Sequence, residues 1–355
     1  MIELLGEATK RSASDLHIVV GVRPVLRVNG KFIYIGDEEV SDDIAKNLLV
    51  EISSIIVYNH TEEMGESDFS FEGTGEYRFR VNAYKESGHL AMAIRIINNN
   101  IKKLKELGIP EIIVDILNYK SGLILVTGST GSGKSTTLAS MIDYINENEE
   151  KHIITIEEPI EYLHKHKKSL VNQREIGVDT KSFYSGVLSS LRQSPDIIMI
   201  GEIRDVKTME TALRAAETGH LVLSTLHTLG AVESLDRIVD MFKPEEKHNI
   251  RAQLASVCRA IVSQQLILAR NEKIILASEV MVVTTAIRNL IREGKNHQIK
   301  NLIQTGSQYG MYTMDQFLTE LFISGEISKE ALISRISDEK IVSELLNGSD
   351  TKFSG

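Results

Sequence analysis

Residues 128–135 read Gly-Ser-Thr-Gly-Ser-Gly-Lys-Ser and match the G-x-x-x-x-G-K-[ST] pattern of a phosphate-binding loop. The preceding apolar run 123–127 has strand character, and the segment 135–144 contains no proline or glycine and predicts a helix. A strand, a glycine-rich turn and a helix in this order direct backbone N–H groups and a helix N-terminus at one point in space. A chance glycine-rich turn is the alternative, and the flanking strand and helix argue against it. The sequence therefore predicts a nucleoside triphosphate site.

The loop gives each kind of residue an expected role. Its glycines allow the backbone to approach phosphate oxygens closely, Lys134 is expected to reach the β- and γ-phosphates, and the Ser135 hydroxyl is expected to hold Mg²⁺. The residues predicted to bind the nucleotide are Gly128, Ser129, Thr130, Gly131, Ser132, Gly133, Lys134, Ser135 and Thr136.

Composition narrows the function classes. The net charge of −9 argues against broad binding of nucleic acid. The single cysteine, Cys258, excludes an intrachain disulfide and a cysteine-cluster zinc site, and its apolar surroundings predict a buried thiol. Residues 1–10 lack the pattern of a secretory signal, and no apolar run approaches the roughly 18 residues that span a bilayer. We expect a cytosolic protein that contacts membranes only through partners.

Residues 1–98 have the pattern of a small α+β domain. Several runs are alternating or β-branched and predict strands, Asn29-Gly30 is a two-residue hairpin signal, and a helix is predicted over 42–58. The strand runs are 15–20, 24–28, 69–71, 77–84 and 91–97. The polar, charged segment 99–108 suits a linker.

Residues 109–270 alternate strand and helix patterns, which predicts a parallel sheet covered by helices. The strands are expected at 123–127, 153–156, 197–200 and 221–224, and the helices at 135–147, 182–192 and 207–218. Beyond Arg251 the chain is expected to be mostly helical, with a helical region over 271–346 and a flexible tail over 347–355.

Carboxylates follow two of the predicted strands. Glu202 follows the run 197–200, and we predict that it is the general base, on the expectation that its strand lies beside the loop strand. Glu157 and Glu158 end another strand and could coordinate Mg²⁺ through water or position the nucleophile. A solvated glutamate is the alternative for Glu202, and a plain acidic turn is the alternative for the pair.

Histidines and arginines provide further candidates. His220 and His227 flank the strand 221–224, and His227 could sense the γ-phosphate or be merely structural. Arg78, Arg80 and Arg95 lie on predicted strands of the first domain. An arginine can neutralise charge in the transition state, whereas the ordinary alternative is a solvated strand face.

Four segments in this order resemble the Walker A, Asp box, Walker B and His box of secretion and pilus motor ATPases: 128–135, 154–162, 191–205 and 215–228. Ser14–Ile18 and Arg78–Tyr84 resemble the N-terminal domain of that superfamily, so the resemblance covers about residues 14–332. Within the superfamily, Ala286–Glu293 is similar to the C-terminal signature of the type IV pilus retraction ATPases, and 253–265 and 304–315 continue the match.

The resemblance implies a RecA-like P-loop NTPase domain, a smaller N-terminal α+β domain of PAS-like type and a helical C-terminal region. It implies ATP and Mg²⁺ as cofactors and a cytoplasmic homohexamer at the inner face of the membrane, acting on an inner-membrane pilus platform protein to power retraction and twitching. It implies that Arg80 and Arg95 face the nucleotide and that His220 and His227 form the His box. Glu158 stands where the family usually has aspartate.

Two other classes of motor share the same ATP chemistry. A pilus-assembly or type II secretion ATPase differs in partner and direction, and the signature at 286–293 and the lack of four cysteines argue against it. A nucleic-acid motor also uses a RecA-like core, and the net charge argues against that class. A nonhydrolysing scaffold is disfavoured by Glu202.

Overall fold

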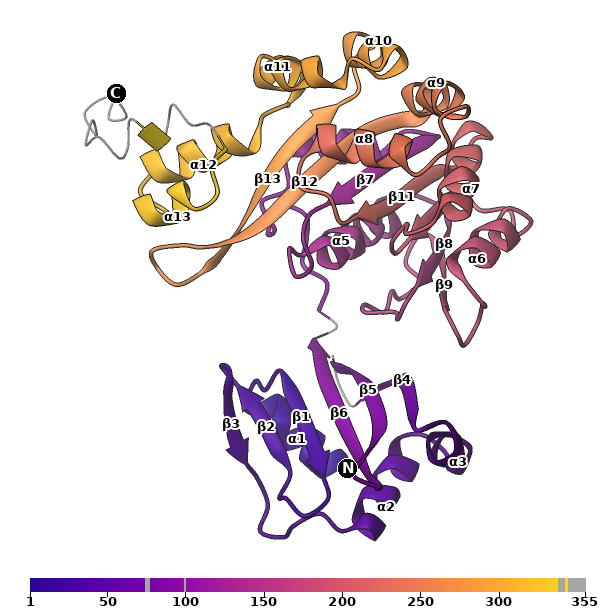
Figure 1. Ribbon diagram of the computed structural model, residues 1–355, viewed down its shortest axis with the longest axis vertical. Coiled ribbons are helices and arrows are strands. Elements are labelled where there is room, and N and C mark those ends of the chain that lie inside the picture. The colour runs from indigo at the N-terminus through magenta and orange to yellow at the C-terminus, as the bar shows by residue number, and fades with distance from the viewer. Residues whose placement is uncertain (74–76, 99, 338–341, 344–355) are drawn as a thin grey trace. The chain divides into compact units, whose positions relative to one another are not determined.

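The computed structural model describes residues 1–73, 77–98, 100–337 and 342–343, and the chain divides into two compact units (Figure 1). The N-terminal unit comprises residues 1–100 together with 159–163, and the C-terminal unit comprises 101–158 and the chain from 164 onward. The flexible tail predicted at 347–355 lies outside the described residues. Within the described part of the chain, no helix combines the length and the apolar character needed to cross a membrane.

The N-terminal unit is an antiparallel sheet of six strands in the order β3-β2-β1-β6-β5-β4, with three helices. Its core forms because alternate strand residues, such as Phe79, Val81 and Ala83, are buried on one face, against apolar residues of the helices. The elements are α1 (Ile2–Lys10), β1 (Asp15–Val19), β2 (Val25–Val28), β3 (Lys31–Tyr34), α2 (Asp42–Ile52), α3 (Ile55–Met64), β4 (Glu66–Glu72), β5 (Tyr77–Glu86) and β6 (His89–Asn98).

Two local expectations for this unit were wrong. The single helix predicted over 42–58 is two helices, because Ser53 donates its hydroxyl to the Leu49 carbonyl at the end of α2 and Ser54 caps the Val57 N–H at the start of α3. The Asn29-Gly30 turn leads from β2 into β3, a strand that the sequence analysis did not predict. Both turn residues have positive φ, 49° and 78°, as a two-residue hairpin requires.

The C-terminal unit contains a sheet of seven strands in the order β13-β12-β7-β11-β10-β8-β9. All neighbouring strands are parallel except β13, which pairs antiparallel with β12. The strands are β7 (Gly122–Thr127), β8 (His152–Glu157), β9 (Leu170–Glu175), β10 (Ile197–Ile200), β11 (Leu221–Leu226), β12 (Cys258–Leu268) and β13 (Ile274–Val282).

Helices cover both faces of this sheet (Figure 1). Leu123 and Leu125 of β7 pack with α6 to α11, whereas Ile124 and Val126 pack with α4 and α5. The helices are α4 (Glu111–Leu117), α5 (Lys134–Asn148), α6 (Phe183–Ser190), α7 (Val206–Glu217), α8 (Ala231–Asp240), α9 (Lys247–Val257), α10 (Thr285–Glu293), α11 (Ile299–Gln304), α12 (Met314–Ile323) and α13 (Lys329–Ile333). Burial on both faces explains why β7 is continuously apolar over residues 123–126.

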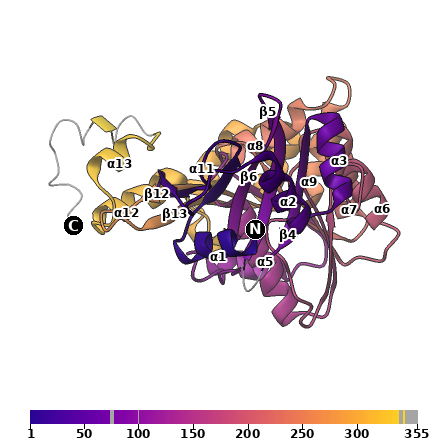
Figure 2. The same cartoon turned by 90° about the horizontal axis from the view of Figure 1, so that it is seen from below.

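The expectation that the chain beyond Arg251 is mostly helical holds after Val282 but is wrong over 258–282. This segment forms the β12–β13 hairpin, which extends the sheet and packs against α12 and α13 (Figures 1 and 2). Because β12 is buried on both sides over much of its length, it lacks the alternation that distinguishes a strand from a buried helix. The strand β9 was also missed, because three of its six residues are Asn172, Gln173 and Arg174.

Candidate active site

The phosphate-binding loop follows β7 and leads into α5, as predicted. Gly128, Gly131 and Gly133 have φ values of 146°, 79° and 89°, which residues with a side chain rarely adopt. A Cβ at Gly128 would also lie 2.4 Å from the Gln264 carbonyl oxygen and 2.5 Å from Ser132 Oγ. Glycine is therefore required at position 128 by both conformation and space.

Lys134 is buried at the first position of α5. Its Nζ donates to the carbonyl oxygens of Gly128 and Ser129, each at 2.9 Å, so the ammonium group lies within the loop. Ser135 is exposed in the same first turn, while Ser129, Thr130 and Gly131 form the exposed tip of the loop. The loop thus places one cation and the N-terminus of a 15-residue helix together, which is the arrangement that binds phosphate.

Gln264, which the sequence analysis did not assign to the site, supports this loop from β12. Its side chain is completely buried, and Nε2 donates to the Ser132 carbonyl at 2.8 Å. β12 is the neighbour of β7, and Ser263 pairs with Thr127 immediately before the loop. The sequence did contain a signal for this role, namely a glutamine inside an apolar run. Such a side chain is expected to be buried, and buried polar side chains normally have a hydrogen-bond partner.

Glu202 lies two residues beyond β10, with a side chain that is 13% exposed. Its Oε2 lies 2.9 Å from His227 Nε2, and its Oε1 pairs with the Arg204 guanidinium. Arg204 also lies 3.8 Å from Glu158 Oε2. The ends of β8, β10 and β11 therefore bring one histidine, one arginine and two carboxylates together at the carboxyl edge of the sheet, where α/β proteins bind ligands.

The strand order corrects one expectation about Glu202. Its strand β10 does not lie beside the loop strand, because β11 is inserted between β7 and β10. β11 instead fixes the turn that carries Glu202. The hydroxyls of Ser224 and Thr225 donate to the carbonyls of Ile200 and Gly201 at 2.8 and 2.6 Å. These two hydroxyl groups, which sequence reasoning missed, orient the Glu202 backbone.

The neighbouring acids differ in environment. Glu157 is buried and accepts hydrogen bonds from Thr155 Oγ1 at 2.6 Å and from Gln173 Nε2 at 3.0 Å. Glu158 is nearly half exposed on the adjacent turn. Glu157 is thus held by its neighbours, while Glu158 is accessible from solvent.

Comparison with known proteins shows the family to which the chain belongs. Residues 1–286 match the family described as type II/IV secretion system protein. This chain belongs to the type II/IV secretion system protein family. A type IV pilus retraction ATPase of Pseudomonas aeruginosa, PilT, is 45% identical over 92% of this chain and 95% of its own length. A twitching motility protein of Neisseria gonorrhoeae is 42% identical over 97% of this chain and 92% of its own length.

Among solved structures, the crystal structure of the pilus retraction motor PilT with bound ADP matches with a TM-score of 0.91 at 44% identity, over 97% of this chain and 99% of that one. These comparisons confirm the resemblance to the pilus retraction ATPases and the predicted fold class.

In this chain, the two histidines predicted for the site lie at opposite ends of β11. His227 follows the strand and contacts Glu202, whereas His220 precedes it and bonds through Nδ1 to the Ala215 carbonyl at 3.0 Å. A strand of six residues is about 20 Å long, so this chain does not bring His220 to its own phosphate loop. A role for His220 stays a prediction.

The predicted arginines lie on one face of the N-terminal sheet. Arg80 of β5 is directly opposite Arg95 of β6, and Arg95 is opposite Asp15, with Nε and Oδ1 3.3 Å apart. Arg80 is exposed, and Arg95 is 66% exposed. Arg78 is buried and donates to Ser70 Oγ, so the alternative of a solvated face is wrong at this residue.

Two remaining features of the C-terminal unit follow the sequence analysis. Cys258 is fully buried, and burial raises the pKa of its thiol to about 12. In the signature helix α10, Ile287 and Ile291 are buried while Arg292 is exposed. Arg288 of the same helix is half-buried and donates to the Ala255 carbonyl at 3.1 Å.

Proposed function

We propose that this chain, a retraction ATPase of type IV pili, hydrolyses ATP with Glu202 as the general base. The observation that carries the proposal is the contact of Glu202 with His227 and Arg204 at the sheet edge that also bears the phosphate loop. A carboxylate there can polarise a water molecule beside a bound γ-phosphate. Each Glu202 oxygen accepts one of these contacts and keeps a further lone pair for water.

The phosphate loop is suited to ATP with Mg²⁺. Gly128 has no room for a side chain, Lys134 lies inside the loop, and Ser135 is exposed at the start of α5. In the proposed complex Lys134 exchanges its carbonyl partners for phosphate oxygens, and Ser135 holds Mg²⁺, with Glu158 able to contact it through water. Mg²⁺, when bound, neutralises charge on the phosphate oxygens.

His227 and the arginines supply the remaining proposed roles. His227 touches the base, so it can report whether a γ-phosphate is present by exchanging its bond to Glu202 for one to phosphate. Arg80 and Arg95 are directly opposed like charges, an arrangement that destabilises a sheet, and the Asp15 carboxylate offsets it at Arg95. We assign both to charge neutralisation at the nucleotide, either of their own chain or of a neighbouring subunit.

The proposed motor is a cytoplasmic homohexamer at the inner face of the membrane. It acts on an inner-membrane platform protein of the pilus, contacts the membrane only through partners and does not use nucleic acid. Hydrolysis would shift each subunit between two conformations that differ in affinity for ATP.

The test is the Glu202→Gln variant as the only copy in cells, with Glu210→Gln as the matched control. Glu210 is an exposed acid on α7 that pairs with Arg214 and lies outside the site. We expect Glu202→Gln to lower phosphate release about 10²- to 10⁴-fold, as the loss of a general base does, and to give abundant pili without twitching. Bald cells would instead indicate an assembly motor. Hydrolysis that depends on single-stranded DNA would indicate a nucleic-acid motor.

A further inference from the structure

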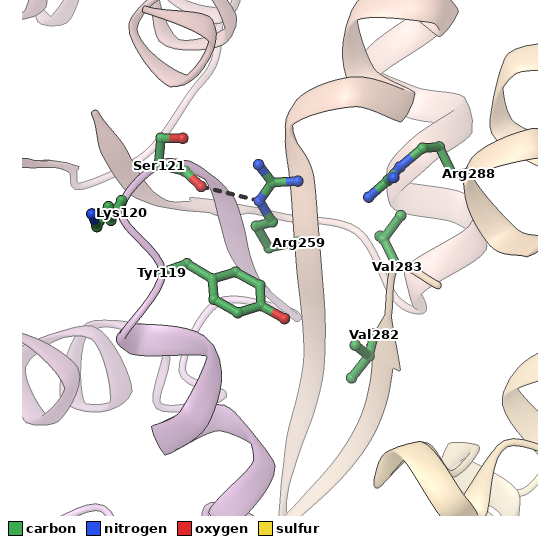
Figure 3. A pocket seen from close by; sticks show the side chains of 7 residues that line it. All are labelled: Tyr119, Lys120, Ser121, Arg259, Val282, Val283 and Arg288. Carbon is green, nitrogen blue, oxygen red and sulfur yellow. Dashed lines mark hydrogen bonds between the residues drawn. The ribbon is translucent and has the colours of Figure 1, made fainter. Parts of the chain in front are cut away.

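A cavity lies near the start of β7, at the end of this strand remote from the phosphate loop, and Figure 3 shows the residues that line it. It has a volume of about 370 Å³ and is lined by three cationic side chains, those of Lys120, Arg259 and Arg288. Tyr119 precedes β7 and Val283 follows β13, and both also line it. β7 separates the cavity from the phosphate loop by six residues, or about 20 Å. The cavity is therefore distinct from the nucleotide site.

The backbone is shaped to bring Arg259 into this cavity. The pairing of β12 with β7 shifts register between Cys258 and Ala260, so Arg259 is the extra residue of a β-bulge. Bulges redirect a side chain at the cost of regular pairing. The Arg259 side chain passes close to Gly122, the first residue of β7, which has a φ of 133°, and a Cβ there would lie 2.5 Å from Arg259 Cγ. A bulge on one strand and a glycine on the next are both needed to seat this guanidinium.

Backbone carbonyls hold both guanidinium groups in place. Arg259 donates from Nε to the Ser121 carbonyl at 3.0 Å and from Nη1 to the Ser256 carbonyl at 3.2 Å, as Figure 3 shows for the first. Arg288, from the signature helix α10, donates from Nε to the Ala255 carbonyl. Each arginine has five N–H donors, so three remain on Arg259 and four on Arg288 beyond these bonds.

The cavity carries positive charge without a counter-ion. Among the residues that the structure describes, no carboxylate lines it, and neither arginine nor Lys120 forms an ion pair. Neighbouring cations repel each other when no acid lies between them. The bonds to backbone carbonyls hold the two arginines in position, so they cannot move apart to reduce this repulsion. Such a group is stabilised by an anion.

We infer that this cavity binds the phosphate group of a small soluble compound. Phosphate carries up to two negative charges and several acceptor oxygens, which match three cations and the planar fork of arginine better than a single carboxylate does. The volume lies in the range of small-molecule sites. The Tyr119 ring, 5.8 Å from the Arg259 guanidinium carbon, and the adjoining valines offer apolar surface to the rest of the compound.

The chain contains no tryptophan, so a single introduced tryptophan can report on the cavity without background emission from others. Tyr119 is 45% exposed, so Tyr119→Trp places one fluorophore beside the cavity with little disturbance of the core. The full-length variant would be saturated with ADP, which occupies the phosphate loop, and then titrated with pyrophosphate at constant ionic strength. We expect a saturable change in tryptophan emission.

Further variants in the same background decide the assignment. Arg259→Gln, or Lys120→Gln as the less disruptive change, should weaken pyrophosphate binding by about tenfold or more, since each removes a charge-assisted contact. Arg214→Gln, an exposed arginine on α7, should leave it unchanged. No saturation, or equal affinity in Arg259→Gln and Arg214→Gln, would overturn the inference. Equal binding of acetate would overturn the phosphate assignment, and a response to phosphatidylglycerol vesicles but not to pyrophosphate would overturn the assignment to a soluble compound.

Discussion

Replacing Gln264 with methionine should weaken nucleotide binding while leaving the core almost as stable. Gln264 Nε2 donates to the Ser132 carbonyl, and a buried carbonyl that loses its donor costs about 1–3 kcal/mol. Gln264 Oε1 is buried and has no hydrogen-bond partner within the described part of the chain. Removing this atom therefore stabilises the folded state by a similar free energy. The two effects oppose each other. We therefore expect the free energy of unfolding to change by less than about 1 kcal/mol.

The loss should appear in binding, because the Ser132 peptide lies between two glycines and the Gln264 bond orders it. If the ligand must supply 1–3 kcal/mol to order the loop, the Kd for ADP rises roughly 5- to 150-fold. Isothermal titration calorimetry measures the Kd, and urea unfolding measures the stability. The control is Gln265→Met, since successive strand residues point to opposite faces. Lower stability with an unchanged Kd would refute the reasoning, because Gln264 would then act only in core packing.

Three further predictions concern the same unit. His227→Ala should lower ATP hydrolysis by at least tenfold, whereas His220→Ala should stay within about twofold in a phosphate-release assay, because only His227 touches Glu202. Gly128→Ala should abolish ADP binding in calorimetry, since its Cβ would overlap the Gln264 carbonyl; measurable binding would show that the loop can shift. Burial raises the pKa of Glu279 above its usual 4.5, so the unfolded chain releases the proton first as pH rises. Stability from this group is therefore complete below about pH 4.5 and declines above it, and Glu279→Gln should remove that decline in urea midpoints measured from pH 4.5 to 7.

The local chemistry of the site could be predicted because it depends on short segments. Glycine spacing in residues 128–133 determines which φ values are accessible, and the loop indeed has positive φ at its three glycines. Glu202 could be singled out because it follows a short, fully apolar strand. Both inferences need only neighbours in the sequence, where conformational preferences act.

Long-range pairing could not be predicted in the same way. Nothing in β11 itself indicates that it lies between β7 and β10, since all three strands are short and buried. The order is set by pairing between residues 24 apart, as for Ile197 with Leu221, and 99 apart, as for Gly122 with Leu221, and sequence periodicity does not report such contacts. The same limit explains the error at 258–282, where a strand buried on both faces lacks alternation.

The β12–β13 hairpin, which the sequence did not predict, contacts several parts of the site. On β12, Gln264 holds the phosphate loop, and Ser263 Oγ accepts the Gly230 N–H at 2.9 Å, just beyond His227. Directly opposite Ser263 on β13, Glu279 accepts the Ala231 N–H at the start of α8 and the Met314 N–H at the start of α12.

One pair of strands thus contacts the phosphate loop, the segment after His227 and a C-terminal helix. A displacement of the loop by bound phosphate would strain the Gln264 bond, and the paired strands would carry that strain to Glu279 and the two helix starts it caps. Substitutions in 258–282 should therefore alter nucleotide affinity together with the position of α12, and those in the remote helices α12 and α13 should act on affinity only through Glu279.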